Sequence, residues 1–216
     1  MSRHDRFLDR REAGRLLGAA LARLKLDDPV VLALPRGGVP VGYEVARQLG
    51  APLDILLVRK IGAPGHEEYG IGALVDGASP QVVIHEAAAR MTGADKAYID
   101  RTVARELAEL ERRRAAYRTR PPEKLAGRAV VVVDDGIATG GTVRAALKGL
   151  GQVGARRVVL AVPVAPADTL QELRGLCDEV VCLITPEPFY AVGAHYRDFD
   201  QTTDEEVIRL LGEQRQ

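Results

Sequence analysis

The sequence is poor in cysteine and has no excess of either charge. Its two cysteines, Cys177 and Cys182, lie near each other without a second pair or clustered histidines, which excludes a zinc site of ordinary ligand spacing. Basic and acidic residues balance at 30 each, so no global field favours nucleic acid or an anionic membrane as a partner. Any anion binding must therefore come from local clusters. We expect both thiols to be ordinary and half-buried.

Long apolar runs are also missing. No window approaches the roughly 18 uncharged apolar residues of a membrane span, and the first residues are charged, unlike a secretory signal. The 216 residues are enough for one α/β domain with a sizeable core. We expect a cytoplasmic protein with a single domain over residues 1–216.

The most informative stretch is residues 130–142, which read VVVVDDGIATGGT. Four consecutive valines are typical of a strand buried on both faces, as in parallel sheets covered by helices. From Thr142 onwards, apolar residues recur at helical spacing. The stretch therefore predicts a strand, a loop and a helix in succession.

This succession is suited to phosphate binding. It aims free backbone N–H groups and the positive end of a helix dipole at an anion. Gly140 and Gly141 allow a phosphate to approach the backbone, and Thr139 and Thr142 can add hydroxyl donors.

Two acids, Asp134 and Asp135, follow the valines at the end of the strand where open α/β sheets bind ligands. Carboxylates repel a bare phosphate, but they accept hydrogen bonds from sugar hydroxyls and ligate Mg²⁺. A simpler interpretation is a strand ending in acids, with Thr142 as a helix N-cap. The combination of valines, paired acids and threonines favours the ligand site.

This stretch resembles the phosphoribosyl pyrophosphate signature of the type I phosphoribosyltransferases, and the chain resembles most a bacterial group of them without an assigned acceptor. The resemblance implies that Asp134 and Asp135 hold the ribose hydroxyls and bind Mg²⁺ as the cofactor. It also implies substrate contacts from the loop residues Gly136, Ala138, Thr139, Gly140, Gly141 and Thr142.

An earlier unit has the same organisation. Residues 30–34 are a short apolar run, residues 40–49 have helical spacing, and Arg36, Gly37 and Gly38 stand between them. By itself this is equally a plain turn with a solvated arginine. In the family, such a loop grips pyrophosphate, often with a cis peptide before a non-proline residue. The resemblance therefore implies that these three residues bind pyrophosphate and that a cis bond precedes Arg36.

Arg59 and Lys60 end the strand predicted at residues 52–58. Adjacent cations at the carboxyl end of a strand suit a polyphosphate, although solvated strand-end charges have the same pattern. The glycine-rich residues 61–74 indicate a mobile lid rather than a packed element. Because the family often places Arg-Lys just before a mobile catalytic loop, we expect Arg59 to bind substrate. The residues expected to act in catalysis are Lys60, Arg36 and Asp135.

An insertion at about residues 61–125 is expected to form a flap. Residues 73–75 and 81–85 read as a hairpin, and residues 93–118 as one long charged helix. Acids alternate with bases along this helix, which favours a solvated face over a nucleic-acid site. Packing within the flap and a homodimer contact are both open roles for it.

The remainder continues the same alternation of strands and helices. Residues 157–164 and 180–184 read as buried strands, with a helix at residues 168–176 between them. The repeated pattern predicts an α/β fold with a doubly wound, mainly parallel sheet and right-handed crossovers.

Aromatic residues gather in the last part of the chain, about residues 185–216. Flat bases stack on aromatic faces, and in the family the acceptor base binds near this end of the sheet. The resemblance thus implies a hood in which Phe189 and Tyr190 contact the base. Rings that simply cover the sheet edge explain the pattern equally well. Thr203 with Glu206 predicts a capping box for a final helix.

The expected function is Mg²⁺-dependent transfer of ribose 5-phosphate from phosphoribosyl pyrophosphate to a nitrogen of a base, with release of pyrophosphate. The partners are then small molecules, and neither nucleic acid nor a membrane. Two alternatives are open: a non-catalytic sensor that keeps the binding site, and a hydrolase that uses water as the acceptor. Arg36 and Lys60 favour chemistry over sensing. No motif identifies the base.

Overall fold

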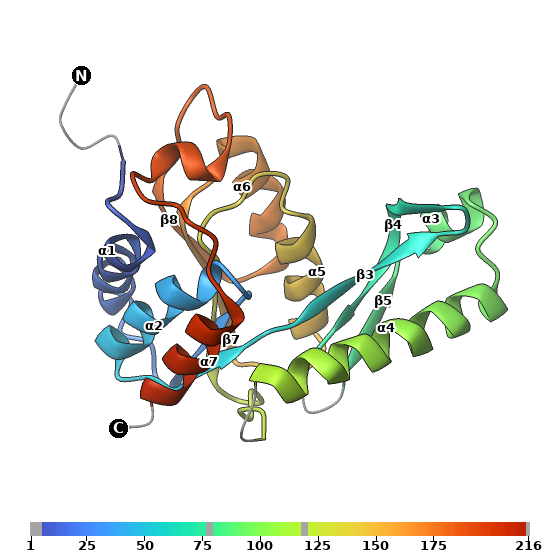
Figure 1. Ribbon diagram of the computed structural model, residues 1–216, viewed down its shortest axis with the longest axis horizontal. Helices are drawn as coiled ribbons and strands as arrows, with labels where there is room; N and C mark the ends of the chain where they lie inside the picture. Colours follow the sequence, from blue (N-terminus) through green and yellow to red (C-terminus); the bar gives the residue numbers. More distant parts are fainter. Residues whose placement is uncertain (1–5, 77–79, 118–120, 215–216) are drawn as a thin grey trace.

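Five parallel strands form the central sheet of the protein. The computed structural model describes residues 6–76, 80–117 and 121–214 (Figure 1). The strands are β1 Pro29–Ala33, β2 Leu53–Ile55, β6 Ala129–Val133, β7 Arg157–Val164 and β8 Glu179–Ile184. They stand in the order β2-β1-β6-β7-β8, so β1 and β6 are neighbours although the flap separates them in sequence.

Helices cover both faces of this sheet. They are α1 Arg10–Ala22, α2 Gly38–Leu49, α5 Gly141–Leu150, α6 Ala167–Leu173 and α7 Asp204–Glu213. Alternate residues of β6 point to opposite faces: Val131 packs with α1, α2 and α7, whereas Val130 and Val132 pack with α5 and α6. All five residues of β6 are buried. The expected doubly wound parallel fold is therefore confirmed.

A second, antiparallel sheet forms the flap that extends to one side of the core (Figure 1). Its strands are β3 (Val58–Ala63), β4 (His66–Val75) and β5 (Gln81–Ile84). The pairing of β4 with β5 confirms the predicted hairpin, whose turn falls partly outside the described residues.

Residues 61–74 form a packed element, contrary to the expectation, because two paired strands joined by a turn at Pro64 and Gly65 present a buried face. Ile61 and Ile71 are fully buried against Ile99 and Val103 of helix α4 (Lys96–Tyr117). The glycines are compatible with strands here because the flap packs closely. The sequence pattern also missed the short helix α3 (Glu86–Met91) that follows β5.

Helix α4 covers the flap and then reaches the core. Its first half packs on the flap sheet, while Leu110 and Tyr117 join the core cluster beneath α2 and α7. The helix therefore joins the flap to the core, and its packing on the flap is one of the two roles left open for it.

The carboxyl-terminal segment lies against the amino-terminal residues. Phe7 and Tyr196 form a parallel bridge, and Phe7 N–H donates to the His195 carbonyl at 2.8 Å. A 3-10 turn, η2 (Val192–His195), directly precedes Tyr196. Another 3-10 turn, η1 (Arg174–Leu176), follows α6. Thr203 caps α7 by accepting from Glu206 N–H, as the capping box predicts.

The expectation of ordinary, half-buried thiols is confirmed by the described part of the chain. Cys177 and Cys182 are half-buried free thiols, and burial raises the pKa of Cys182 to about 11. Within residues 6–76, 80–117 and 121–214, no helix has both the length and the apolar character needed to cross a membrane.

Candidate functional site

The loop between β6 and α5 has the form of an anion cradle. Gly140 is the N-cap residue of α5 with φ of 73°, a left-handed conformation that favours glycine, and no side chain caps the helix. The first turn of α5 therefore has no side-chain cap, and it begins at the exposed residues Gly141 and Thr142. Thr142 lies inside the first turn, so the simpler interpretation of Thr142 as the N-cap is wrong.

A second loop lies directly beside this cradle. Strands β1 and β6 pair in register, Ala33 opposite Val133, so the residues after β1 emerge next to Asp134. A Cβ at Gly38 would stand 2.8 Å from the Val133 carbonyl, and one at Gly37 only 2.1 Å from Oδ2 of Asp135. Glycine is thus required where the two loops touch. The bond between Pro35 and Arg36 is cis, as the resemblance implies.

The two acids have different surroundings. Asp134 lines the main cavity, whereas the Asp135 carboxylate pairs with Arg10, whose Nε donates to Oδ2 at 2.8 Å. Burial, and then the charge of Asp135, raises the pKa of Asp134 well above its ordinary value. Burial also raises the pKa of Asp135, while Arg10 acts in the opposite direction.

Arg10 is a site residue that sequence reasoning missed. Its guanidinium lies 3.9 Å from the ring centroid of Phe199, and its Nη1 donates to the Asp200 carbonyl at 2.7 Å. The Tyr196 hydroxyl donates to the Asp135 carbonyl from the same side. No local pattern marks Arg10, because its partners lie at the far end of the chain.

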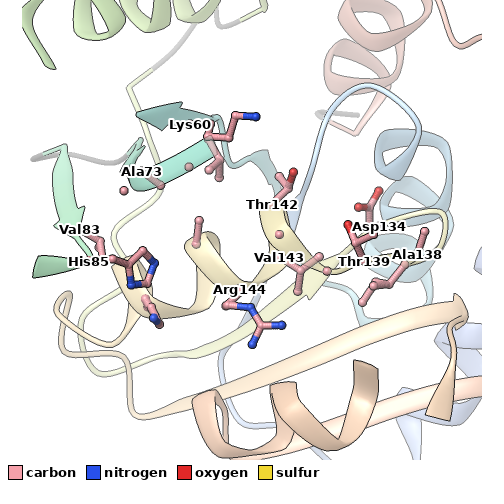
Figure 2. A pocket seen from close by; sticks show the side chains of 18 of the residues that line it. Lys60, Ala73, Val83, His85, Asp134, Ala138, Thr139, Thr142, Val143 and Arg144 are labelled. Atoms are coloured by element: carbon pink, nitrogen blue, oxygen red, sulfur yellow. The ribbon is translucent and has the colours of Figure 1, made fainter. Parts of the chain in front are cut away.

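A cavity of about 580 Å³ runs from Asp134, along the exposed side of α5, to the flap. Figure 2 shows Asp134, Ala138 and Thr139 at one end, Lys60 and His85 at the flap end, and Thr142 between them. The volume is in the range usual for small-molecule sites. The cavity collects the predicted loop residues Gly136, Ala138, Thr139, Gly140, Gly141 and Thr142, together with Lys60.

Arg59 and Lys60 are separated by the alternation of β3. Lys60 lines the cavity, but Arg59 points to α4 and pairs with Glu106, with Nη2 at 2.7 Å from Oε2. The structure therefore brings only Lys60 of this pair to the cavity.

The Arg36 side chain also points away from the main cavity. It lines a second cavity of about 280 Å³ with Arg112, Arg113 and Tyr117 of α4. Its Nη1 lies 3.6 Å from Oδ1 of Asp204, at the start of α7. Only the backbone of Arg36, and not its side chain, belongs to the loop that Gly37 and Gly38 form.

The predicted base-stacking residues do not line either cavity. Phe189 stacks on His195 with 5.6 Å between ring centroids, and Tyr190 is 82% exposed. Tyr196 and Phe199 cover the sheet edge around Arg10. The positions of these rings favour the interpretation that they cover the sheet edge over the interpretation that they stack on a base.

The acids can be tested as holders of Mg²⁺ by their chemistry. Among the residues that the structure describes, no three His, Cys, Asp or Glu side chains gather as a metal cluster. Mg²⁺ does not require one, because it is commonly bound by one or two carboxylates, water and substrate phosphates. Asp134, which lines the cavity beside the anion cradle, fits a Mg²⁺ ion that arrives with a phosphorylated ligand, and Asp135 would join it through the carboxylate oxygen that Arg10 does not hold.

A doubly wound parallel sheet with an uncapped helix N-terminus at the point where strand order reverses is the architecture of α/β proteins that bind phosphate-bearing small molecules. Comparison with known families agrees. The chain belongs to the phosphoribosyl transferase domain family, whose profile matches residues 5–198.

Relatives of known sequence and structure support this assignment. Rv0571c of Mycobacterium tuberculosis, which bears the provisional name of phosphoribosyl transferase, is 48% identical over 206 residues, or 95% of this chain. The alignment covers 46% of that protein, so the chain spans about half the length of the curated relatives it matches.

Two solved structures extend the comparison. TT1426 of Thermus thermophilus is 50% identical with a TM-score of 0.87, covering 96% of this chain and 98% of its own. AQ2163 of Aquifex aeolicus is 14% identical with a TM-score of 0.51 and coverages of 85% and 78%, and it shares the fold alone.

Replacing Gly141 with Ala is expected to change stability and ligand binding in opposite directions. A Cβ at Gly141 meets no atom within 4 Å, so alanine in the first turn of α5 should stabilise the fold by about 0.5 kcal/mol. The added methyl group projects beside the cradle and should weaken binding of a phosphorylated ligand about tenfold, or by about 1.4 kcal/mol. Thermal unfolding with and without phosphoribosyl pyrophosphate measures both effects. An undiminished ligand-induced shift would argue against phosphate binding here.

Proposed function

We propose that the protein is a phosphoribosyltransferase that uses Mg²⁺ and transfers ribose 5-phosphate from phosphoribosyl pyrophosphate to a nitrogen of a base. The observation that carries this proposal is the arrangement at the carboxyl end of β6, where Asp134 and the uncapped start of α5 line one cavity. An acid for sugar hydroxyls next to N–H donors for a phosphate matches a phosphorylated ribose.

Each part of the site then has one task. The N–H groups at Gly141 and Thr142, with the Thr139 hydroxyl, bind the 5′-phosphate, and Asp134 accepts hydrogen bonds from the ribose hydroxyls. The backbone of Gly37 and Gly38 approaches the pyrophosphate, and the Asp135 carboxylate, which Arg10 holds, lies against Gly37 where the two loops meet.

In the proposed reaction, the bond from ribose C1 to the pyrophosphate oxygen breaks and a bond from C1 to the base nitrogen forms. Pyrophosphate leaves with the electron pair of the broken bond, and the base loses a proton where it carries one. Lys60, which lines the cavity, is the cation proposed to stabilise the leaving charge. Arg36, whose side chain lies in the second cavity near Asp204, is proposed to join it by turning towards the pyrophosphate. Mg²⁺ held by Asp134 and Asp135 would supply further neutralisation of the pyrophosphate.

The acceptor is the least constrained part of the proposal, because Phe189 and Tyr190 do not line the cavity. Release of pyrophosphate should therefore be measured with phosphoribosyl pyrophosphate and Mg²⁺ across a panel of purines, pyrimidines and other nitrogen bases, and with no base. We expect turnover that requires one class of base. Turnover without any base would assign a hydrolase instead, and binding without turnover would assign a sensor.

Binding of the donor has its own test. Phosphoribosyl pyrophosphate at millimolar concentration with Mg²⁺ should raise the Tm of the protein by mass action. At a donor concentration of 100 times its Kd, the free energy of unfolding should increase by about 2.7 kcal/mol. Ribose 5-phosphate and free pyrophosphate, each of which is one part of the donor, serve as comparison ligands in the same measurement. A Tm that does not change with the full donor would sink the proposed site.

A further inference from the structure

At its flap end the main cavity holds, besides Lys60, side chains to which the proposed reaction assigns no role. From the cradle it continues along the outer side of α5 to the flap, where Val83 of β5 and His85, the N-cap residue of α3, form its wall. In Figure 2 this flap end lies on the opposite side of Thr142 from Asp134. A donor held at Asp134 and at the Gly37 loop leaves this end open.

Cationic side chains line the flap end. Lys148, half-buried on α5, lies near His85, and its charge and that of Arg144 help to lower the His85 pKa, after burial. Within the described part of the chain, the Lys148 ammonium makes no hydrogen bond or ion pair. Arg144 is already paired with Glu172 of α6 at 2.6 Å. An ammonium without an acceptor, facing a cavity, is suited to an anionic group of a ligand.

The spacing selects the kind of anion. Lys148 follows Thr142 by six residues on α5, or about 9 Å along the helix axis. A single phosphate in the cradle cannot contact both positions. A chain of three phosphates can span the two positions, because the flexible four-carbon side chain of lysine extends the reach of its ammonium group. In the proposed binding mode the pyrophosphate of the donor lies against Gly37 and Gly38, on the Asp135 side of the site, and so does not form this chain.

We propose that the flap end of the cavity is a second anion subsite, in which Lys148 and His85 bind the terminal phosphate of a nucleoside 5′-triphosphate whose first phosphate lies in the Gly141–Thr142 cradle. The subsite rests on the proposed function only in that the cradle binds a 5′-phosphate. A nucleotide bound in this way occupies the same cradle as phosphoribosyl pyrophosphate and therefore competes with it.

The test uses the whole chain and inorganic tripolyphosphate as the probe, with orthophosphate for comparison, by isothermal titration calorimetry without Mg²⁺. Tripolyphosphate should bind at least tenfold more tightly than orthophosphate. Lys148→Gln should weaken tripolyphosphate about tenfold, as expected for loss of one charge-assisted hydrogen bond, and leave orthophosphate unchanged. Glutamine preserves helix propensity, so α5 should remain intact.

Lys96→Gln is the matched control, since Lys96 is an exposed lysine of α4 that does not line the cavity. Equal tripolyphosphate affinity in the two variants would overturn the subsite, as would equal affinity of the wild type for tripolyphosphate and orthophosphate. A nucleoside 5′-triphosphate should outcompete the matching 5′-monophosphate in the wild type and lose that advantage in Lys148→Gln. An unchanged advantage would also contradict the proposal.

The same samples separate this proposal from the proposed function. Suppose that phosphoribosyl pyrophosphate with Mg²⁺ shifts the Tm but the affinity for tripolyphosphate does not depend on Lys148. The subsite is then rejected and the donor site is retained. Dependence of tripolyphosphate on Lys148, without any shift from the donor, removes the donor and keeps the subsite.

Discussion

Asp134→Asn is expected to lower pyrophosphate release on the order of 100-fold and to remove the Tm shift caused by phosphoribosyl pyrophosphate with Mg²⁺. The amide keeps the size of the carboxylate, and its oxygen can still accept the Asp135 N–H bond that Asp134 Oδ1 accepts at 2.9 Å. What is lost is the carboxyl group proposed to bind the ribose hydroxyls and Mg²⁺. The fold should therefore persist, as measured by thermal unfolding without ligand.

Asp100→Asn provides the control for this variant. Asp100 is an exposed acid of α4 that pairs with Lys96, outside both cavities. It should retain full turnover and the full ligand-induced shift. Wild-type turnover in Asp134→Asn would show that the acid at the end of β6 is structural and that the ribose lies elsewhere.

Gly37→Ala is expected to destabilise the protein by about 1–3 kcal/mol and to abolish donor binding. The backbone at Gly37 has φ of −60°, which alanine adopts readily, so the effect is purely steric. The new Cβ would stand 2.1 Å from Oδ2 of Asp135, and the carboxylate must leave its 2.8 Å contact with Arg10 to make room. Thermal unfolding should show a fall in Tm of several degrees.

A double-mutant cycle identifies the cause. Asp135→Ala alone removes the partner of Arg10 and should itself cost stability, because it leaves a mostly buried cation without its counter-charge. In the Asp135→Ala background, however, Gly37→Ala meets no carboxylate, and its cost should fall towards zero. Additive costs would mean that the clash lies elsewhere in the loop.

Sequence patterns were sufficient where the physical cause is local. The valine run at β6 has no polar side chain for solvent, so it predicts a strand buried on both faces, and β7 begins and ends at the predicted residues. The cradle is equally local, since a strand, glycines and a helix start are contiguous at Gly140 and Gly141. The long helix in the flap followed from its periodic apolar residues.

The failures have a different origin. The glycines of residues 61–74 indicate mobility when only neighbours are considered, but Ile61 and Ile71 are buried by residues of α4, which lie well beyond them in the chain. Arg59 and Lys60 were both assigned to substrate, whereas the pleat of β3 turns one of them to Glu106. Arg10 meets Asp135 across 125 positions, a distance at which no periodicity operates.

The contact of Arg10 with Asp135 and with the Asp200 carbonyl also sets the order in which the site can form during synthesis. A ribosome releases Arg10 first, Asp135 much later and Asp200 later still. Until Asp200 has emerged, Arg10 of α1 lacks its bond to the Asp200 carbonyl. The Asp135 carboxylate that Arg10 holds is then not fixed in its position beside Gly37. A nascent chain is therefore expected to reach its ligand-competent form only after Asp200 has left the ribosome.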